Sequence, residues 1–245
     1  MVVVCVLVGA CATDPPELEI AANQAPVEGT CELSQVRTGR AIPSGTFDLA
    51  IGDRSSYVLT PLVRNNGTSD LTIRTARLEA YEEVAEGSIR LNFACEVPEG
   101  CQEWDIDLCA GGACPVIEPG GTASFEVQAL PRVVTGYYQL MMDAAVRSGR
   151  VPPEFELRSV VRLIAGDVER EVVSAAFSFG IRLCLGCLVE FPEGTDSPGL
   201  PGPDCCGPGT PVTTCYPGQD GPIDCRSCLR TLPEICNFGR VSCGS

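Results

Sequence analysis

The stretch 155–187 reads FELRSVVRLIAGDVEREVVSAAFSFGIRLCLGC, and it decides the fold. In its first half, alternate positions share one face of an extended chain: Phe155, Leu157, Ser159, Val161 and Leu163. In its second half, apolar residues alternate in the same way: Val173, Ala175, Phe177, Phe179, Ile181 and Leu183. Such alternation is typical of a strand with one buried face. Gly166 and Asp167 suit a turn between the runs. We therefore predict a β-hairpin that leads directly into Cys184.

Composition limits the compartment and the partners. The chain has 245 residues and a formal net charge of −15, with 17 basic against 32 acidic residues. Because such an acidic surface repels phosphate backbones, we expect no nucleic-acid partner. The 16 cysteines indicate an oxidising compartment, since so many thiols pair stably only there.

The residue types that are absent argue against an enzyme. The chain contains no histidine, which excludes Ser-His-Asp and Cys-His catalytic arrangements and histidine-bearing zinc sites. No phosphate-binding loop or dinucleotide-binding glycine motif occurs. A glycosidase with two carboxylates remains open in principle, but no acidic pair is singled out by the sequence. We predict a protein that is not an enzyme, with no cofactor and no metal.

The N-terminus has the pattern of an export signal. Residues 1–10, MVVVCVLVGA, form an apolar run that is too short to span a bilayer as a helix. The residues Val8-Gly9-Ala10-Cys11 resemble the bacterial lipobox, and this resemblance implies that Cys11 is acylated and becomes the mature N-terminus. An ordinary cleaved signal peptide and a cytoplasmic start are the alternatives. Residues 11–30 are acidic and rich in proline, and we interpret them as the lipidated cysteine followed by a flexible tether.

From residue 31 to residue 187, strand signals recur. Besides the hairpin, apolar residues alternate at 47–51, 71–80, 89–93, 123–129 and 138–146, and 56–64 is β-branched and aromatic. Within 71–80 the buried phase slips after Ile73, as a β-bulge allows. Pro61 indicates an edge or a bulge, and Asn65-Asn66-Gly67 is a turn signal. With about eight or nine strands and no convincing amphipathic helix, we predict an all-β fold, an antiparallel β-sandwich.

Two segments resemble a known group of sandwiches. VRNNGTSDLTI, at Val63–Ile73, is similar to a turn of immunoglobulin-like domains of the ASH, MSP and CARDB type. IEPGGTASFEVQALP, at Ile117–Pro131, resembles a later strand of the same domains. The resemblance implies an Ig-like fold and a binding or scaffolding role, and it transfers no site residues.

A cysteine-rich insertion interrupts the strands at 95–114. It holds four cysteines, for which we predict two local disulfides: Cys95, Cys101, Cys109 and Cys114. It also holds the single tryptophan, Trp104, next to Asp105 and Asp107. These three residues are a candidate binding tip, but Trp104 could equally fill the small core of the loop. Two carboxylates are too few for calcium, which takes six to eight oxygens.

The tail at 188–245 is built from turn-forming residues and cysteines. Because such a segment buries little apolar surface, we predict a disulfide-stabilised, loop-dominated module. Nine cysteines lie between the end of the hairpin and the C-terminus: Cys184, Cys187, Cys205, Cys206, Cys215, Cys225, Cys228, Cys236 and Cys243. A zinc site formed by the two C-x-x-C pairs is the rival interpretation, and redox chemistry at one pair is another. Neither pair lies in the βαβ context of thioredoxin-like proteins.

An odd number of tail cysteines requires one partner outside the tail. Cys31 is the single cysteine left after the insertion has paired internally, and it precedes the first strand expected after the tether. We therefore predict a Cys31–Cys184 or Cys31–Cys187 disulfide that joins the two ends of the sandwich.

Together these patterns predict an exported protein of the cell envelope. The chain resembles lipoproteins of Gram-negative bacteria, anchored in the outer membrane and facing the periplasm or the cell surface. We expect surface display, adhesion or scaffolding, with the membrane as one partner through the lipid and an envelope protein or glycan as another. A small-ligand, carbohydrate or inhibitor-type binding module is the first alternative, and an unrecognised carbohydrate-active enzyme is the second.

Overall fold

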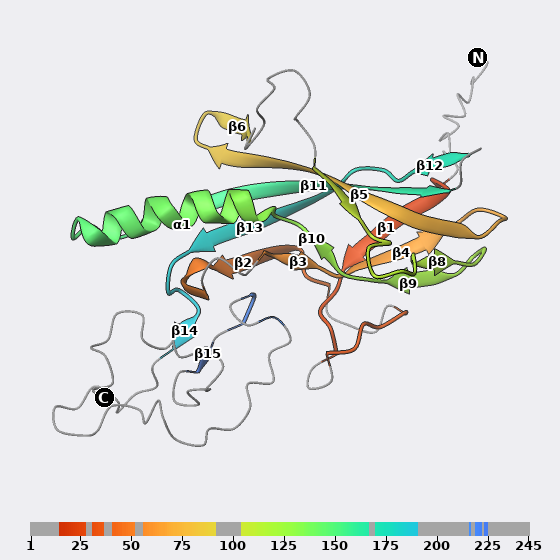
Figure 1. The fold of residues 1–245 in the computed structure, drawn as a ribbon, viewed down its shortest axis with the longest axis horizontal. Helices are drawn as coiled ribbons and strands as arrows, with labels where there is room; N and C mark the ends of the chain where they lie inside the picture. The colour runs from red at the N-terminus through yellow and green to blue at the C-terminus, as the bar shows by residue number, and fades with distance from the viewer. Residues whose placement is uncertain are drawn as a thin grey trace, which may run out of the picture.

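The computed structural model describes residues 15–27, 31–36, 41–51, 56–91, 104–166, 170–190, 216, 219–221 and 223–224. In these residues, the two largest sheets pack face to face, two further pairs of strands accompany them, and one α-helix lies at an end of the sandwich (Figure 1). The fold is a mainly antiparallel β-sandwich, as the alternating runs predicted.

The larger sheet has the hairpin stretch at its centre. Its strands run in the order β2-β13-β11-β5-β6, with β12 on β11 and with β7 and β8 on β5. Their bounds are β2 (Ser44–Asp48), β5 (Leu71–Val84), β6 (Gly87–Arg90), β7 (Trp104–Asp107), β8 (Val116–Ile117), β11 (Phe155–Gly166), β12 (Glu171–Val173) and β13 (Phe177–Cys184). The pairs are antiparallel except β13–β2, which is parallel. This parallel pair departs from the purely antiparallel sandwich that the sequence predicted.

The hairpin forms as predicted, with one change of phase. In β11–β13, Phe155 lies opposite Leu183 and Val161 opposite Phe177. Before β13 the alternation is broken, because Val172 is buried and Val173 is exposed. The Ser174 hydroxyl is turned inward, where it accepts the N–H of Leu163. The shared face predicted from Val173 onward is therefore wrong at its start.

The phase slip in 71–80 is a bulge in the structure. Against β11, Thr75 lies opposite Ile164, but Ile73 lies opposite the next residue, Ala165. One residue of β5, Arg74, is left between them and is exposed. The bulge lets both Ile73 and Ala76 face the core, where neither is accessible to solvent.

The second sheet closes the other side of the core. It has the order β1-β4-β9, and β10 pairs with β3 beside it. The bounds are β1 (Leu18–Asn23), β3 (Val58–Leu59), β4 (Pro61–Asn65), β9 (Thr122–Ser124) and β10 (Val127–Gln128). Pro61 begins β4, a position at which its missing N–H is tolerated. Two short strands, β14 (Val189–Glu190) and β15 (Ile223–Asp224), pair with each other.

Strand β1 contradicts the prediction that residues 11–30 form a flexible tether, because part of this range belongs to the sandwich. Leu18–Asn23 pairs antiparallel with β4, from Leu18 opposite Asn65 to Asn23 opposite Pro61. Leu18 is fully buried. This strand was not predicted because its apolar residues do not alternate regularly. In the structure, its register against β4 shifts between Ile20 and Ala22.

The core lies between the sheets and continues under the helix. Its largest fully buried side chains come from the sheets, from α1 and from the segments next to them: Tyr57, Tyr138, Phe47, Phe179, Leu18, Leu59, Leu62, Leu71, Ile73, Leu78, Ile117 and Leu130. Tyr57 packs against Phe47 and Phe179, with ring centroids 6.2 and 5.5 Å away.

The strand expected at 138–146 is an α-helix, α1 (Arg132–Arg147). Its buried residues Val134, Tyr138, Met142 and Ala145 recur every three or four positions, which is the helical period. The sequence prediction was wrong because apolar residues occupy almost every position of this segment, so that a period of two fits it as well. A short 3-10 helix, η1 (Leu49–Ile51), likewise replaces the end of the run expected at 47–51.

Candidate functional site

Helix α1 packs against the sandwich through Tyr138. The Tyr138 ring packs against Phe155, with centroids 4.6 Å apart, and its hydroxyl donates to Glu82 at 2.7 Å. Burial, followed by the hydrogen bond to Glu82, raises the pKa of the Tyr138 hydroxyl. Proline at position 131 precedes the helix, and no side chain caps its first turn. Packing of one face, rather than capping, therefore holds α1 in place.

A second apolar stripe runs along the outer face of α1. Val133, Tyr137, Leu140 and Met141 are each at least 40% exposed, and Leu140 reaches 66%. With Ala144, which is also exposed, the positions 133, 137, 140 and 144 are spaced by four, three and four residues. This is the spacing with which one helix packs along another. An exposed apolar stripe on a helix that already has a buried face is a candidate interaction surface.

The charge near the ends of this stripe is opposite in sign to that of the whole chain. Arg132 and Arg147 begin and end α1, and Arg150 follows it; all three are exposed. Within the helix itself the single acidic residue is Asp143. The molecule therefore presents a locally basic, apolar helix on a chain with a net charge of −15.

Trp104, Asp105 and Asp107 do not form a protruding tip. They lie in β7, which pairs with β5 so that Trp104 is opposite Leu78. Trp104 is half-buried and packs against the main core. The Asp105 carboxylate accepts two N–H groups of Arg77, the shorter at 2.8 Å, and Asp107 accepts the N–H of Cys109 at 2.8 Å. All three side chains thus make contacts within the sheet, the core or the turn that follows β7.

Two disulfides join described cysteines. Cys109 bonds Cys114 within the insertion, and Cys184 bonds Cys187 at the end of β13. The predicted Cys31–Cys184 or Cys31–Cys187 bond is therefore wrong, although Cys31 is itself disulfide-bonded. The prediction placed the partner of Cys31 at the end of the last strand, where Cys184 and Cys187 instead bond each other.

The other cysteines named from the sequence lie outside the described residues: Cys11, Cys95, Cys101, Cys205, Cys206, Cys215, Cys225, Cys228, Cys236 and Cys243.

A buried carboxylate, Asp48, lies beside the Cys184–Cys187 disulfide. Asp48 ends β2, is fully buried, and has a carboxylate oxygen within 4.8 Å of both sulfurs. Its oxygens accept the N–H groups of Ala50 at 3.0 Å, Gly186 at 2.6 Å and Leu188 at 2.9 Å. This residue was not predicted as part of a site, because more than 130 positions separate it from the cysteines.

A short segment of the tail contacts the edge of the sandwich. Gln219 forms an isolated bridge with Phe47, and its side-chain amide donates to the carbonyl of Val58 at 2.7 Å while accepting its N–H at 2.9 Å. Asp220 accepts the Tyr57 hydroxyl at 2.5 Å and the N–H of Thr46 at 2.7 Å. Although much of Asp220 as a residue is exposed, burial of its carboxylate raises its pKa, partly offset by these hydrogen bonds. The tail thus meets the core at Tyr57.

Removing the Tyr57 hydroxyl tests this contact. Tyr57→Phe is expected to lower the free energy of unfolding by about 2 kcal/mol, because it leaves a carboxylate without its buried donor. Tyr216→Phe is the matched control, since the Tyr216 hydroxyl donates to Glu126 at 2.8 Å in an exposed position. We expect the control to change stability by no more than about 0.5 kcal/mol. If both variants lose the same free energy of unfolding in urea, the hydrogen bond between Tyr57 and Asp220 stabilises the fold no more than the exposed one between Tyr216 and Glu126.

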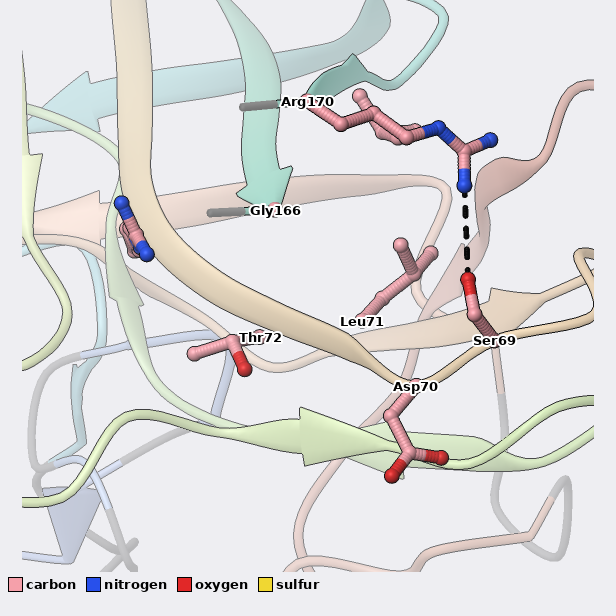
Figure 2. Close-up of a pocket in the computed structure, with 8 residues that line it drawn as sticks. Ser69, Asp70, Leu71, Thr72, Gly166 and Arg170 are labelled. Atoms are coloured by element: carbon pink, nitrogen blue, oxygen red, sulfur yellow. Dashed lines mark hydrogen bonds between the residues drawn. The ribbon is translucent and has the colours of Figure 1, made fainter. Parts of the chain in front are cut away.

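A small polar pocket lies where β5 begins and β11 ends. Its volume is about 200 Å³, and Figure 2 shows Arg170 facing Ser69, with which it forms a 3.4 Å hydrogen bond. Arg170 also forms an ion pair with Glu17. Ligand pockets usually have roughly 300–1,000 Å³ and a mainly apolar lining, so this pocket is a poor match for a drug-sized molecule.

Comparisons with known proteins give no close relative. No protein-family model matches the chain, and no curated protein matches it. Among solved structures, an ASH / PapD-like domain of human CEP192 (PapD-like domain 7) is similar with a TM-score of 0.30 and 11% identity, over 62% of this chain and 94% of that one.

Two further solved structures are similar at the same level. The protein AT1g01470 from Arabidopsis thaliana has a TM-score of 0.31 and 13% identity, over 61% of this chain and 87% of that one. A protein from Archaeoglobus fulgidus has a TM-score of 0.30 and 7% identity, over 53% of this chain and 85% of that one.

In the part of the chain that the structure describes, no helix has the length and apolar character needed to cross a bilayer.

Proposed function

We propose that this protein is a non-catalytic binding module of the cell envelope, which holds a partner through the exposed apolar stripe of helix α1. The stripe is the observation that carries the proposal. Leaving Val133, Leu140 and Met141 in water is unfavourable, and an apolar partner surface would remove that cost. The proposed role is adhesion or scaffolding.

The charges around α1 indicate the chemistry of the partner. Exposed Arg132, Arg147 and Arg150 lie at the ends of the stripe, whereas the chain as a whole is strongly acidic. A partner surface that pairs an apolar strip with acidic residues at its margins complements both features. An envelope protein with an amphipathic helix or groove fits this description.

Export and lipidation are part of the same proposal. Two disulfides among the described residues are consistent with an oxidising compartment. The lipobox-like residues before Cys11 support a lipid anchor in the outer membrane, facing the periplasm or the cell surface. An anchored binding module keeps its partner at the membrane without needing an active site.

Replacing Leu140 by glutamate tests the role of the stripe. Leu140→Glu is expected to weaken partner binding at least about tenfold, because a charge placed in the centre of an apolar contact costs more than 1 kcal/mol. The free energy of unfolding should stay within about 0.5 kcal/mol of wild type, since the side chain is exposed. Binding is measured with the soluble domain and fractionated envelope proteins, and captured proteins are quantified by mass spectrometry.

The matched control is Val116→Glu. Val116 is 55% exposed and lies in β8, at the end of the sandwich away from α1 (Figure 1). A photo-crosslinking amino acid at position 140, with position 116 as its control, identifies what touches the stripe. The proposal fails if both glutamate variants bind equally well, or if position 140 crosslinks no envelope protein. Crosslinking only to a glycan would favour the carbohydrate-binding alternative.

A further inference from the structure

The Cys184–Cys187 disulfide differs from a simple structural cross-link in its surroundings. Cys184, the last residue of β13, is buried, whereas Cys187 lies in the following turn and is accessible to solvent. Asp48 lies within 4.8 Å of both sulfurs, and among the described residues these three form the one cluster of potential metal-ligating or titratable groups of this kind. Cys187 is therefore exposed to a partner and Cys184 is buried, while the Asp48 carboxylate lies near both sulfurs.

The hydrogen bonds of Asp48 leave room for a thiol. A carboxylate offers about four acceptor positions. Three are taken by the N–H groups of Ala50, Gly186 and Leu188. These bonds hold the carboxylate against the turn that carries Cys187. When the disulfide is reduced, the remaining position can accept the S–H of Cys184, whose sulfur also lies 3.8 Å from the carbonyl oxygen of Phe47.

We propose that Cys184, Cys187 and Asp48 form a thiol–disulfide exchange site that oxidises dithiols. A thiolate of the partner attacks the accessible sulfur of Cys187, and the bond between the two cysteines breaks. The electron pair goes to the sulfur of Cys184, and this thiolate takes up a proton from water that is passed on by the Asp48 carboxylate. The partner is then joined to Cys187 in a mixed disulfide.

A second step completes the exchange. The other thiolate of the partner attacks its own sulfur in the mixed disulfide, and Cys187 leaves as a thiolate that is protonated from water. The partner has lost two electrons and two protons and gained a disulfide, while Cys184 and Cys187 have become thiols. In the reverse direction, Asp48 accepts the proton of Cys184 as that thiol attacks the mixed disulfide.

The Cys109–Cys114 disulfide provides an internal control. Both of its cysteines are partly exposed, whereas Cys187, which is attacked in the proposed step, is exposed. Because accessibility alone also favours exchange at Cys184–Cys187, the dependence of its exchange rate on Asp48 is the result that identifies the site.

The experiment follows both disulfides in the same folded protein. Purified protein is incubated in glutathione redox buffers, quenched by alkylation, and the reduced fraction of each pair is measured by peptide mass spectrometry. We expect Cys184–Cys187 to exchange faster than Cys109–Cys114. Asp48→Asn should slow exchange at Cys184–Cys187 by about 100-fold, the lower range for a positioned acid or base, and flatten its pH profile. The control pair should be unaffected by the same substitution.

Single-cysteine variants test the site if Asp48→Asn folds poorly. In Cys184→Ser the accessible Cys187 remains, and it should form a stable mixed disulfide with oxidised glutathione. In Cys187→Ser the buried Cys184 remains, and it should react much more slowly. Equal exchange rates of the two native disulfides, or greater reactivity of Cys184 than of Cys187, would overturn the proposal. So would a well-folded Asp48→Asn variant with an unchanged exchange rate and pH profile.

Discussion

Gly45→Ala is expected to lower the free energy of unfolding by about 3 kcal/mol, at the upper end of the usual cost of overpacking. A Cβ at this buried position of β2 would lie 2.2–2.4 Å from three atoms at the end of the Tyr57 ring. The ring has no room to move, because it packs against Phe47 and Phe179 and its hydroxyl is bonded to Asp220. Tyr57 is also fully buried, so a new rotamer would have to displace other core side chains.

The matched control for this substitution is Gly180→Ala. Gly180 belongs to the neighbouring strand β13 and lies opposite Ser44. A Cβ there would meet nothing closer than the Ser44 Cβ at 3.8 Å, an ordinary contact distance. We expect a change within about 0.5 kcal/mol in urea unfolding. A Gly45→Ala variant as stable as the control would show that the packing around Tyr57 adapts more readily than the close approach implies.

The sequence predicted the central sheet because its strands have one buried face and regular alternation. The bulge in β5 was predictable for the same reason, since a slip of phase between Ile73 and Ala76 has few other structural meanings. Helix α1 was not predictable from alternation. Tyr138 and Met142 lie on its buried face and Leu140 on its exposed face, yet all three are apolar. The exposed stripe that makes α1 a candidate site is the same feature that obscured its period.

Contacts between segments that lie far apart in the sequence could not be predicted from it. Asp48 meets the C-x-x-C turn, and Asp220 meets Tyr57, only after the sheets have assembled. Neither carboxylate belongs to a motif, and each is one of 32 acidic residues in the chain. The Cys184–Cys187 disulfide spans the same turn, in which the N–H groups of Gly186 and Leu188 donate to Asp48.

Cys11→Ser is expected to release the protein from membranes into the soluble fraction. The expectation comes from the lipobox-like Val8-Gly9-Ala10 before it; these positions lie outside the described residues. Each buried methylene of an acyl chain contributes about 0.8 kcal/mol, so several chains hold a soluble domain firmly at a bilayer. Membrane fractionation measures the release, and mass spectrometry of the mature N-terminal peptide measures the modification.

Cys5→Ser is the matched control, because it removes the other cysteine of the same apolar segment. It should leave the protein in the membrane fraction with Cys11 as the modified first residue. An unmodified wild-type N-terminus, or one at another residue, would contradict the lipid anchor. Loss of membrane association in both variants would point to a general defect in export instead.

An anchor at Cys11 would also orient the interaction surface. Cys11 precedes the first residue of β1, Leu18, by seven positions, which span at most about 25 Å when fully extended. In Figure 1, β1 and α1 lie at opposite ends of the sandwich. A lipid joined to the β1 end by so short a link would therefore direct α1 away from the bilayer, toward a partner. Consequently Cys11→Ser should abolish membrane association yet retain binding through α1, whereas Leu140→Glu should do the reverse. A photo-crosslinker at position 140 that labels lipid in the anchored protein would contradict this orientation.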